Sequence, residues 1–65
     1  MSLQVGRCYR YRSALDGELV FLVLKRDARR VCLCLRLWQC GLLRLAETFT
    51  VRASGPFASD SQELR

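Results

Sequence analysis

The sequence contains no histidine, and its only proline is Pro56. Histidine is the usual general acid or base near neutral pH and the commonest metal ligand, so its absence excludes histidine-dependent catalytic pairs and mixed Cys/His zinc sites. The chain also has no glycine-rich phosphate-binding loop and no paired carboxylates at helical spacing. These absences predict a protein that is not an enzyme and binds no cofactor.

Long hydrophobic runs are absent as well. The longest unbroken run of apolar side chains covers residues 19–24, whereas a membrane-spanning helix needs about 20 residues. Residues 1–12 also lack the apolar stretch of a signal peptide. We therefore expect a cytoplasmic protein that contacts no membrane, and in that compartment its four cysteines should be thiols.

The chain is short, but a large fraction of its residues is hydrophobic. Its 65 residues are 51% hydrophobic, and a domain of this size rarely gains more than about 3–5 kcal/mol from its core. The net charge is +5, made of +6 in residues 1–52 and −1 in residues 53–65. We expect a small β-barrel domain over 1–52 and a C-terminal turn with a short helix or flexible tail over 53–65. The basic charge favours phosphate-bearing or acidic partners.

Strand-forming residues recur in segments separated by turn signals. The turn signals are the pair Asp16-Gly17, the basic run 26–30 and Gly41. Between them, β-branched and aromatic content favours strands over helices. The expected strands cover residues 3–12, 18–25, 31–38 and 42–53, and a break near 46–47 would divide the last one into two.

The number and spacing of these strands predict the fold class. Short strands with turns every 8–12 residues are typical of small all-β folds. We predict an all-β fold, a small four- to five-stranded antiparallel barrel whose layout resembles that of SH3-like barrels. A weak capping box, Ser59 with Gln62, predicts one or two helical turns near the C-terminus. A disordered tail is the alternative.

The second and third strands are apolar on both faces, although a half-buried strand should alternate. In the third strand, the face of Val31, Leu33, Leu35 and Leu37 is expected to lie in the barrel interior. The opposite faces would leave six residues at the surface: Val20, Leu22, Leu24, Cys32, Cys34 and Trp38. Burying such a side chain is worth roughly 1.5–3 kcal/mol. We therefore predict a homo-oligomer, most simply a dimer, with these six residues at the interface; a C-terminal tail folded over them is the alternative.

The four cysteines, Cys8, Cys32, Cys34 and Cys40, are candidate thiolate ligands. Structural zinc sites usually use C-x2-C spacing on tight turns. Here the only close pair is C-x-C within an expected strand, where the two side chains lie about 6.5–7 Å apart. This spacing fits neither one metal ion nor an unstrained disulfide, so we predict no metal site and assign the cysteines to packing.

A second candidate site combines basic and aromatic residues. Cations that follow phosphates and rings that stack on bases are typical of small barrels that bind nucleic acid. The alternative is that the tyrosines belong to the core and the cations keep an apolar protein in solution. The candidate nucleic-acid residues are Tyr9, Arg10, Tyr11, Arg12, Lys25, Arg26, Arg29 and Arg30.

These patterns favour binding over catalysis. We expect a small self-associating binding module that acts through protein–protein interaction, for example in regulation. Trp38 and Leu22 are the expected anchors of a protein contact, because exposed aromatic residues often anchor interfaces. Nucleic-acid binding by a basic small barrel is the alternative function.

Overall fold

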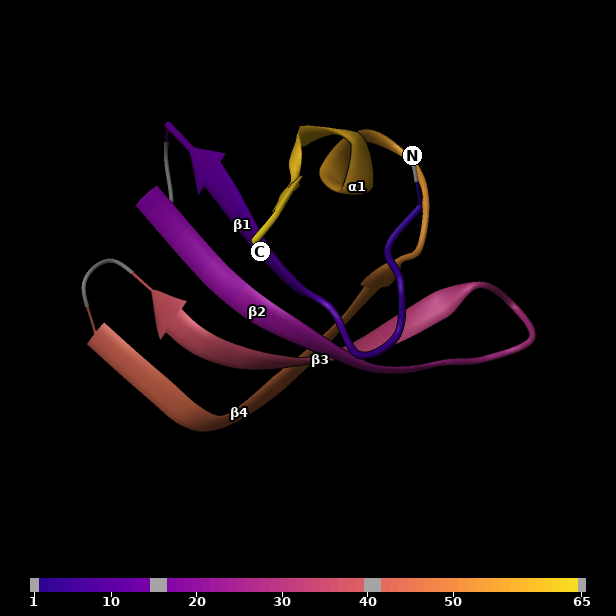
Figure 1. Cartoon of the computed structure of the whole chain (residues 1–65), viewed down its shortest axis with the longest axis horizontal. Coiled ribbons are helices and arrows are strands. Elements are labelled where there is room, and N and C mark those ends of the chain that lie inside the picture. The colour runs from indigo at the N-terminus through magenta and orange to yellow at the C-terminus, as the bar shows by residue number, and fades with distance from the viewer. Residues whose placement is uncertain (1, 15–16, 40–41, 65) are drawn as a thin grey trace.

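A computed structural model of the chain describes residues 2–14, 17–39 and 42–64 (Figure 1). Its strands form one antiparallel sheet in the order β4-β3-β2-β1-β5. One short helix follows β4 and precedes β5 along the chain. The elements are β1 (Cys8–Ser13), β2 (Gly17–Arg26), β3 (Val31–Gln39), β4 (Leu42–Arg52), α1 (Pro56–Asp60) and β5 (Gln62–Glu63).

The antiparallel β-sheet agrees with the predicted all-β class. Each of β1, β2 and β3 pairs with the next strand along the chain, and β5 pairs with the free edge of β1. The sheet is open, with β4 at one edge and β5 at the other. Closure into a barrel is therefore not confirmed.

The short helix begins earlier than the capping box predicts. It starts at Pro56 and ends at Asp60, whereas Gln62 belongs to β5. Proline is favoured at the first helical position because its φ is already helical and no intrahelical partner needs its missing N–H. Gly55 precedes it with a φ of 112°, a conformation that glycine adopts readily.

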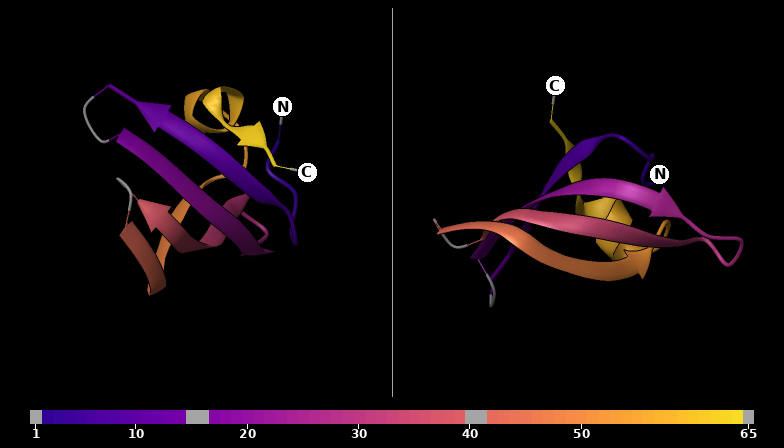
Figure 2. Two further views of the ribbon diagram at one scale, coloured as in Figure 1. Left: turned by 60° about the vertical axis from the view of Figure 1, so that its left-hand side comes forward. Right: turned by 90° about the horizontal axis from the view of Figure 1, so that it is seen from below.

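One face of the sheet forms the core, and we call it the inner face. The helix α1 lies over this face, as the two views of Figure 2 show. The N-terminal segment is held to the sheet by a hydrogen bond from Leu3 N to Ala53 O of 2.7 Å. Among the described side chains, the buried hydrophobic residues are Leu3, Tyr9, Phe21, Val23, Cys32, Cys34, Ala53 and Ala58.

Aromatic rings from four elements meet at the centre of the core. The Phe21 ring lies 5.7 Å from that of Tyr9, 5.6 Å from that of Phe49 and 5.5 Å from that of Phe57. Tyr11 stacks on Phe57 at 4.4 Å. These separations are typical of favourable aromatic pairs. The C-terminal segment is therefore part of the core, because Phe57 is in α1.

The prediction that Val31, Leu33, Leu35 and Leu37 fill the interior is wrong. Directly paired residues of neighbouring strands point to the same face of a sheet. Val23 pairs with Cys34, and both are completely buried, so this pair faces inward. Cys32 is likewise completely buried. The inner face already holds the aromatic rings, and the small thiols fit beside them.

Candidate binding surfaces

The opposite side of the sheet carries a block of apolar side chains that we call the outer face. Val20 pairs with Trp38 and Leu22 pairs with Leu35, in register positions that alternate with the buried ones. Leu33 shares this side because it is two residues from Leu35 along the same strand. The outer face is defined as Val20, Leu22, Leu33, Leu35 and Trp38, all of them partly exposed.

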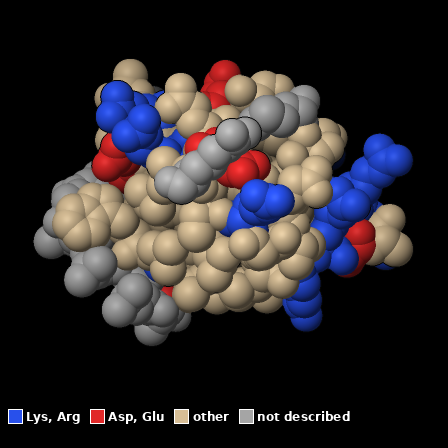
Figure 3. Space-filling model, in the orientation of Figure 1, with Lys and Arg blue, Asp and Glu red and all other residues tan. Residues whose placement is uncertain are grey.

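Small and polar side chains border the outer face. Cys8 pairs with Leu22 on the β1 side, and Thr48 and Thr50 of β4 pair with the two leucines of β3. Figure 3 shows side chains other than Lys, Arg, Asp and Glu over the lower centre of the molecule, where β2 and β3 lie. An apolar centre with a more polar border is the usual composition of a protein interface.

The structure separates the six residues predicted at an interface into two groups. Val20, Leu22 and Trp38 lie on the outer face, and Leu24 is 40% exposed at an irregularity in the pairing of β2 with β3. Cys32 and Cys34 have no exposed surface and cannot contact a partner. Their place on the outer face is taken by Leu33 and Leu35.

The tyrosines of the predicted nucleic-acid site face the core: Tyr9 is buried and cannot stack on a base, and Tyr11 is partly buried. Tyr9 is 1% exposed, and its hydroxyl oxygen accepts a hydrogen bond of 2.7 Å from Gln4 N. Tyr11 packs against Phe57. The sequence signal was their position: both alternate with arginines along β1, so both point to the inner face.

Four of the six basic candidates meet at one end of the sheet, which we call the basic tip, whereas Arg10 and Arg12 lie on β1 beside Glu18. Lys25 and Arg26 end β2, and Arg29 and Arg30 lie in the turn before β3. Arg52, at the end of β4, pairs with Val31, the first residue of β3, and therefore lies at the same end of the sheet as these four cations. In Figure 3, Lys and Arg gather at the right-hand end, where this turn projects. The basic tip is defined as Lys25, Arg26, Arg29, Arg30 and Arg52.

Asp27 orders the turn that carries the basic tip. One of its carboxylate oxygens accepts hydrogen bonds from Arg29 N at 2.8 Å and from Val31 N at 3.0 Å. Its backbone N–H donates to Val31 O at 3.0 Å. Arg30 has a φ of 62°, a conformation that costs energy for a residue with a side chain. The turn is thus held in a single geometry by its own hydrogen bonds.

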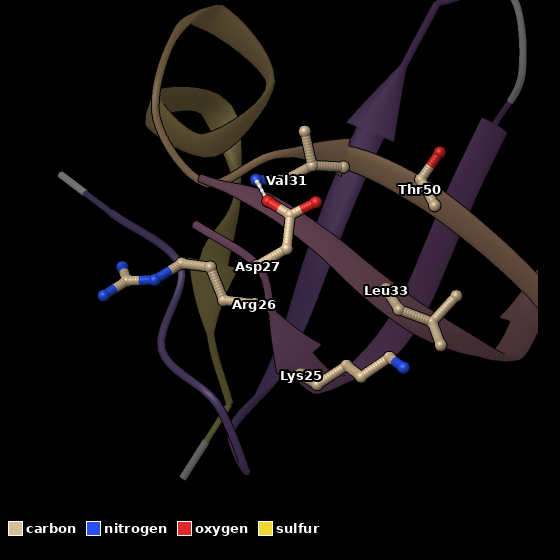
Figure 4. A pocket seen from close by; sticks show the side chains of 6 residues that line it. All are labelled: Lys25, Arg26, Asp27, Val31, Leu33 and Thr50. Carbon is tan, nitrogen blue, oxygen red and sulfur yellow. Dashed lines mark hydrogen bonds between the residues drawn. The ribbon is translucent and has the colours of Figure 1, made fainter. Parts of the chain in front are cut away.

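Two open hollows lie beside this turn, and Val31 lines both of them. The first, of about 400 Å³, is lined by Lys25, Arg26, Asp27, Val31, Leu33 and Thr50 (Figure 4). Figure 4 shows the Lys25 side chain extending beside Leu33, whereas the Arg26 side chain extends away on the other side of the ribbon. The second hollow, also about 400 Å³, is lined by Arg29, Arg30, Val31, Arg52 and Ser54.

The cysteines of the core have the properties of packing residues. Burial raises the pKa of the Cys34 thiol to about 12, so this side chain stays protonated at neutral pH. Burial also raises the pKa of Cys32. No group of three or more His, Cys, Asp or Glu side chains within residues 2–14, 17–39 and 42–64 could hold a metal ion. Cys40 lies outside the described residues.

Comparison of the chain with protein-family models, with curated proteins and with solved structures finds no match. Within the described part of the chain, no helix is long and apolar enough to cross a membrane.

Proposed function

We propose that this protein is a small self-associating binding module, and that it forms a homodimer through its outer face. The observation that carries this proposal is the contiguous block of apolar side chains on β2 and β3, on the side of the sheet opposite α1. An exposed apolar patch with a polar border is a common mark of an interaction site. We also propose an SH3-like layout, supported by the consecutive pairing of β1 to β4 and the return of β5 to β1.

The size of the face is compatible with a dimer. Strands lie about 4.8 Å apart and rise about 3.3 Å per residue, so the part of the sheet formed by β2 and β3 covers roughly 300 Å², and roughly 600 Å² if the flanking strands β1 and β4 join the contact. Two copies would then bury roughly 1,200 Å² in total, which is the lower limit for a stable protein–protein interface. Two twisted sheets can pack face to face at about 10 Å with their strands about 30° apart.

A second copy of the chain is the simplest partner for the outer face, because it brings its own matching apolar surface. In a twofold dimer the same surface meets itself, so the apolar centre of one copy covers that of the other. None of the five outer-face residues is charged, and a symmetric pairing therefore places no charge at the centre of the contact. A different protein partner would have to supply a matching apolar surface.

Sedimentation velocity at low micromolar concentration tests the proposal. The wild-type chain should sediment at twice its monomer mass of 7.5 kDa. Leu22→Glu places a carboxylate at the centre of the outer face and should weaken self-association by about 100-fold or more, because a charge without a partner is costly to bury. Val5→Glu is the matched control, since Val5 is 54% exposed and lies outside the outer face.

Two results would contradict the proposal. A wild-type chain that stays monomeric leaves the outer face without the proposed occupant. A dimer that persists in Leu22→Glu but dissociates in Val5→Glu has its interface elsewhere on the molecule.

A further inference from the structure

The cations of this protein divide into two groups by their surroundings. Four of the described arginines each lie within 4.0 Å of a carboxylate. The pairs are Arg7–Glu63 at 3.2 Å, Arg10–Glu18 at 3.9 Å, Arg12–Glu18 at 3.4 Å and Arg36–Glu47 at 3.3 Å. Within the described residues, none of the five cations of the basic tip forms such a pair. Among the described side chains, the cations without a carboxylate within 4.0 Å are therefore concentrated at this end of the sheet, around Asp27.

The basic tip is also preorganised. The turn is closed by the two hydrogen bonds to Asp27, and it is joined to the end of β4 by a hydrogen bond of 2.8 Å from Ala53 N to Arg30 O. Arg29 and Arg52, which come from different parts of the chain, line the same hollow as a result. A ligand that binds there meets cations whose backbone positions are already fixed, which lowers the entropy lost on binding.

The chemistry of the second hollow favours phosphate. Arg29, Arg30, Arg52 and Ser54 are among the residues that line it, and guanidinium donors match the oxygens of a phosphate in a two-point arrangement. Cations also border the first hollow, which shares Val31 with the second. Cations beside two neighbouring hollows of one hairpin suit a ligand that presents several phosphates in a row.

A regular phosphate backbone is the ligand class that fits these features. Single-stranded nucleic acids are usually held by rings that stack on bases, but no aromatic residue lines either hollow at the tip. A duplex presents its phosphates without unstacking, and its major groove is wide enough for a two-stranded β-ribbon. We propose that the basic tip binds double-helical nucleic acid through its phosphates, without sequence preference.

Fluorescence anisotropy with a labelled DNA duplex of about two helical turns tests this proposal. If all five cations neutralise phosphates, the slope of log K against log salt concentration should be about −4.5. The affinity should then fall about 500-fold between 50 and 200 mM salt. Two duplexes of unrelated sequence should bind with equal affinity.

A pair of double variants with the same change in net charge separates a site from a general charge effect. Arg29→Ala/Arg52→Ala removes two cations from the tip and should reduce the slope to about −2.7. Arg7→Ala/Arg12→Ala removes two cations that are paired with carboxylates, and it should leave the slope near that of wild type. Circular dichroism confirms that both variants are folded.

Three results would overturn the proposal. The first is an equal loss of affinity in the two double variants, which would mean that only net charge matters. The second is tighter binding of a single strand of the same length than of the duplex. The third is displacement of the duplex by an equal charge concentration of polyglutamate, which would identify an acidic protein segment as the ligand class. Arg29 and Arg52 are not among the five outer-face residues, so the comparison of the two double variants can be made whether or not the chain dimerises.

Discussion

Replacing Phe57 by alanine should test whether α1 belongs to the core. The ring of Phe57 lies 4.4 Å from that of Tyr11, 5.5 Å from that of Phe21 and 6.5 Å from that of Phe49. Each such pair contributes about 0.5–1.5 kcal/mol beyond the apolar area it buries. Phenylalanine-to-alanine changes in a core cost about 3–5 kcal/mol, and we expect about 3 kcal/mol here because Phe57 remains partly exposed.

This loss is comparable to the whole stability expected of so small a domain, about 3–5 kcal/mol. Urea denaturation monitored by circular dichroism measures this loss of stability as a large fall in the urea concentration at the transition midpoint. Phe57→Leu, which keeps apolar volume but loses the ring contacts, should lie between wild type and Phe57→Ala. Leu64→Ala is the control, since Leu64 is 39% exposed. If the free energy of unfolding of Phe57→Ala lies within about 0.5 kcal/mol of the wild-type value, α1 does not pack on the sheet and the description of the core is wrong.

The remaining predictions concern single side chains. Asp27→Ala should lower the free energy of unfolding by about 1–2 kcal/mol, because the N–H groups of Arg29 and Val31 lose their acceptor; Asp27→Asn keeps an acceptor oxygen, and equal losses in the two variants would refute this role. Gly55→Ala should cost about 1 kcal/mol in the same assay, because alanine is strained at a φ of 112° even though no atom lies within 4 Å of the new carbon. Stability should fall as the pH rises from about 9 to about 12, by at most about 1.4 kcal/mol per pH unit, because the Cys34 thiol ionises near 9.0 when unfolded and only near 12 when folded. Cys34→Ala should show a shallower pH dependence than wild type, and identical profiles would refute the effect of burial.

The strands were predictable from local sequence, but their bounds and the helix were less so. β-branched and aromatic residues mark 18–25 and 31–38, and the structure has strands at Gly17–Arg26 and Val31–Gln39, whereas the strand expected over 3–12 begins at Cys8 and ends at Ser13. The end of the chain was harder, because a proline after glycine is typical of both a turn and a helix start. The outcome depends on the contact of Phe57 with residues far away in sequence.

The choice of inner and outer face could not be made from β3 alone. Both of its faces are apolar, so period-two alternation does not say which one is buried. The answer comes from the register with β2, where Val23 is opposite Cys34 and Leu22 is opposite Leu35. Leucines are larger than cysteines and were therefore assigned to the interior, whereas the core space was already taken by rings.

For the candidate sites as well, residues adjacent in sequence could be predicted to cluster, whereas contacts between residues far apart in sequence could not. The cations of the β2–β3 turn are adjacent in sequence and were recognised as a cluster. Arg52 was missed because only the pairing of β4 with β3 places it beside Val31. The roles of Tyr9 and Arg10 follow instead from local alternation along β1, which sends Tyr9 to the core and leaves Arg10 to pair with Glu18.

The emission of Trp38, the only tryptophan, is the most direct test of the idea that the second apolar face is covered by another copy. In the assembled protein this ring should emit at short wavelength and resist quenching by iodide. On dilution its emission should move to longer wavelength over the same concentration range in which sedimentation shows dissociation, and Leu22→Glu should emit at long wavelength throughout. An emission maximum that stays at long wavelength in an assembled wild-type protein would contradict the account.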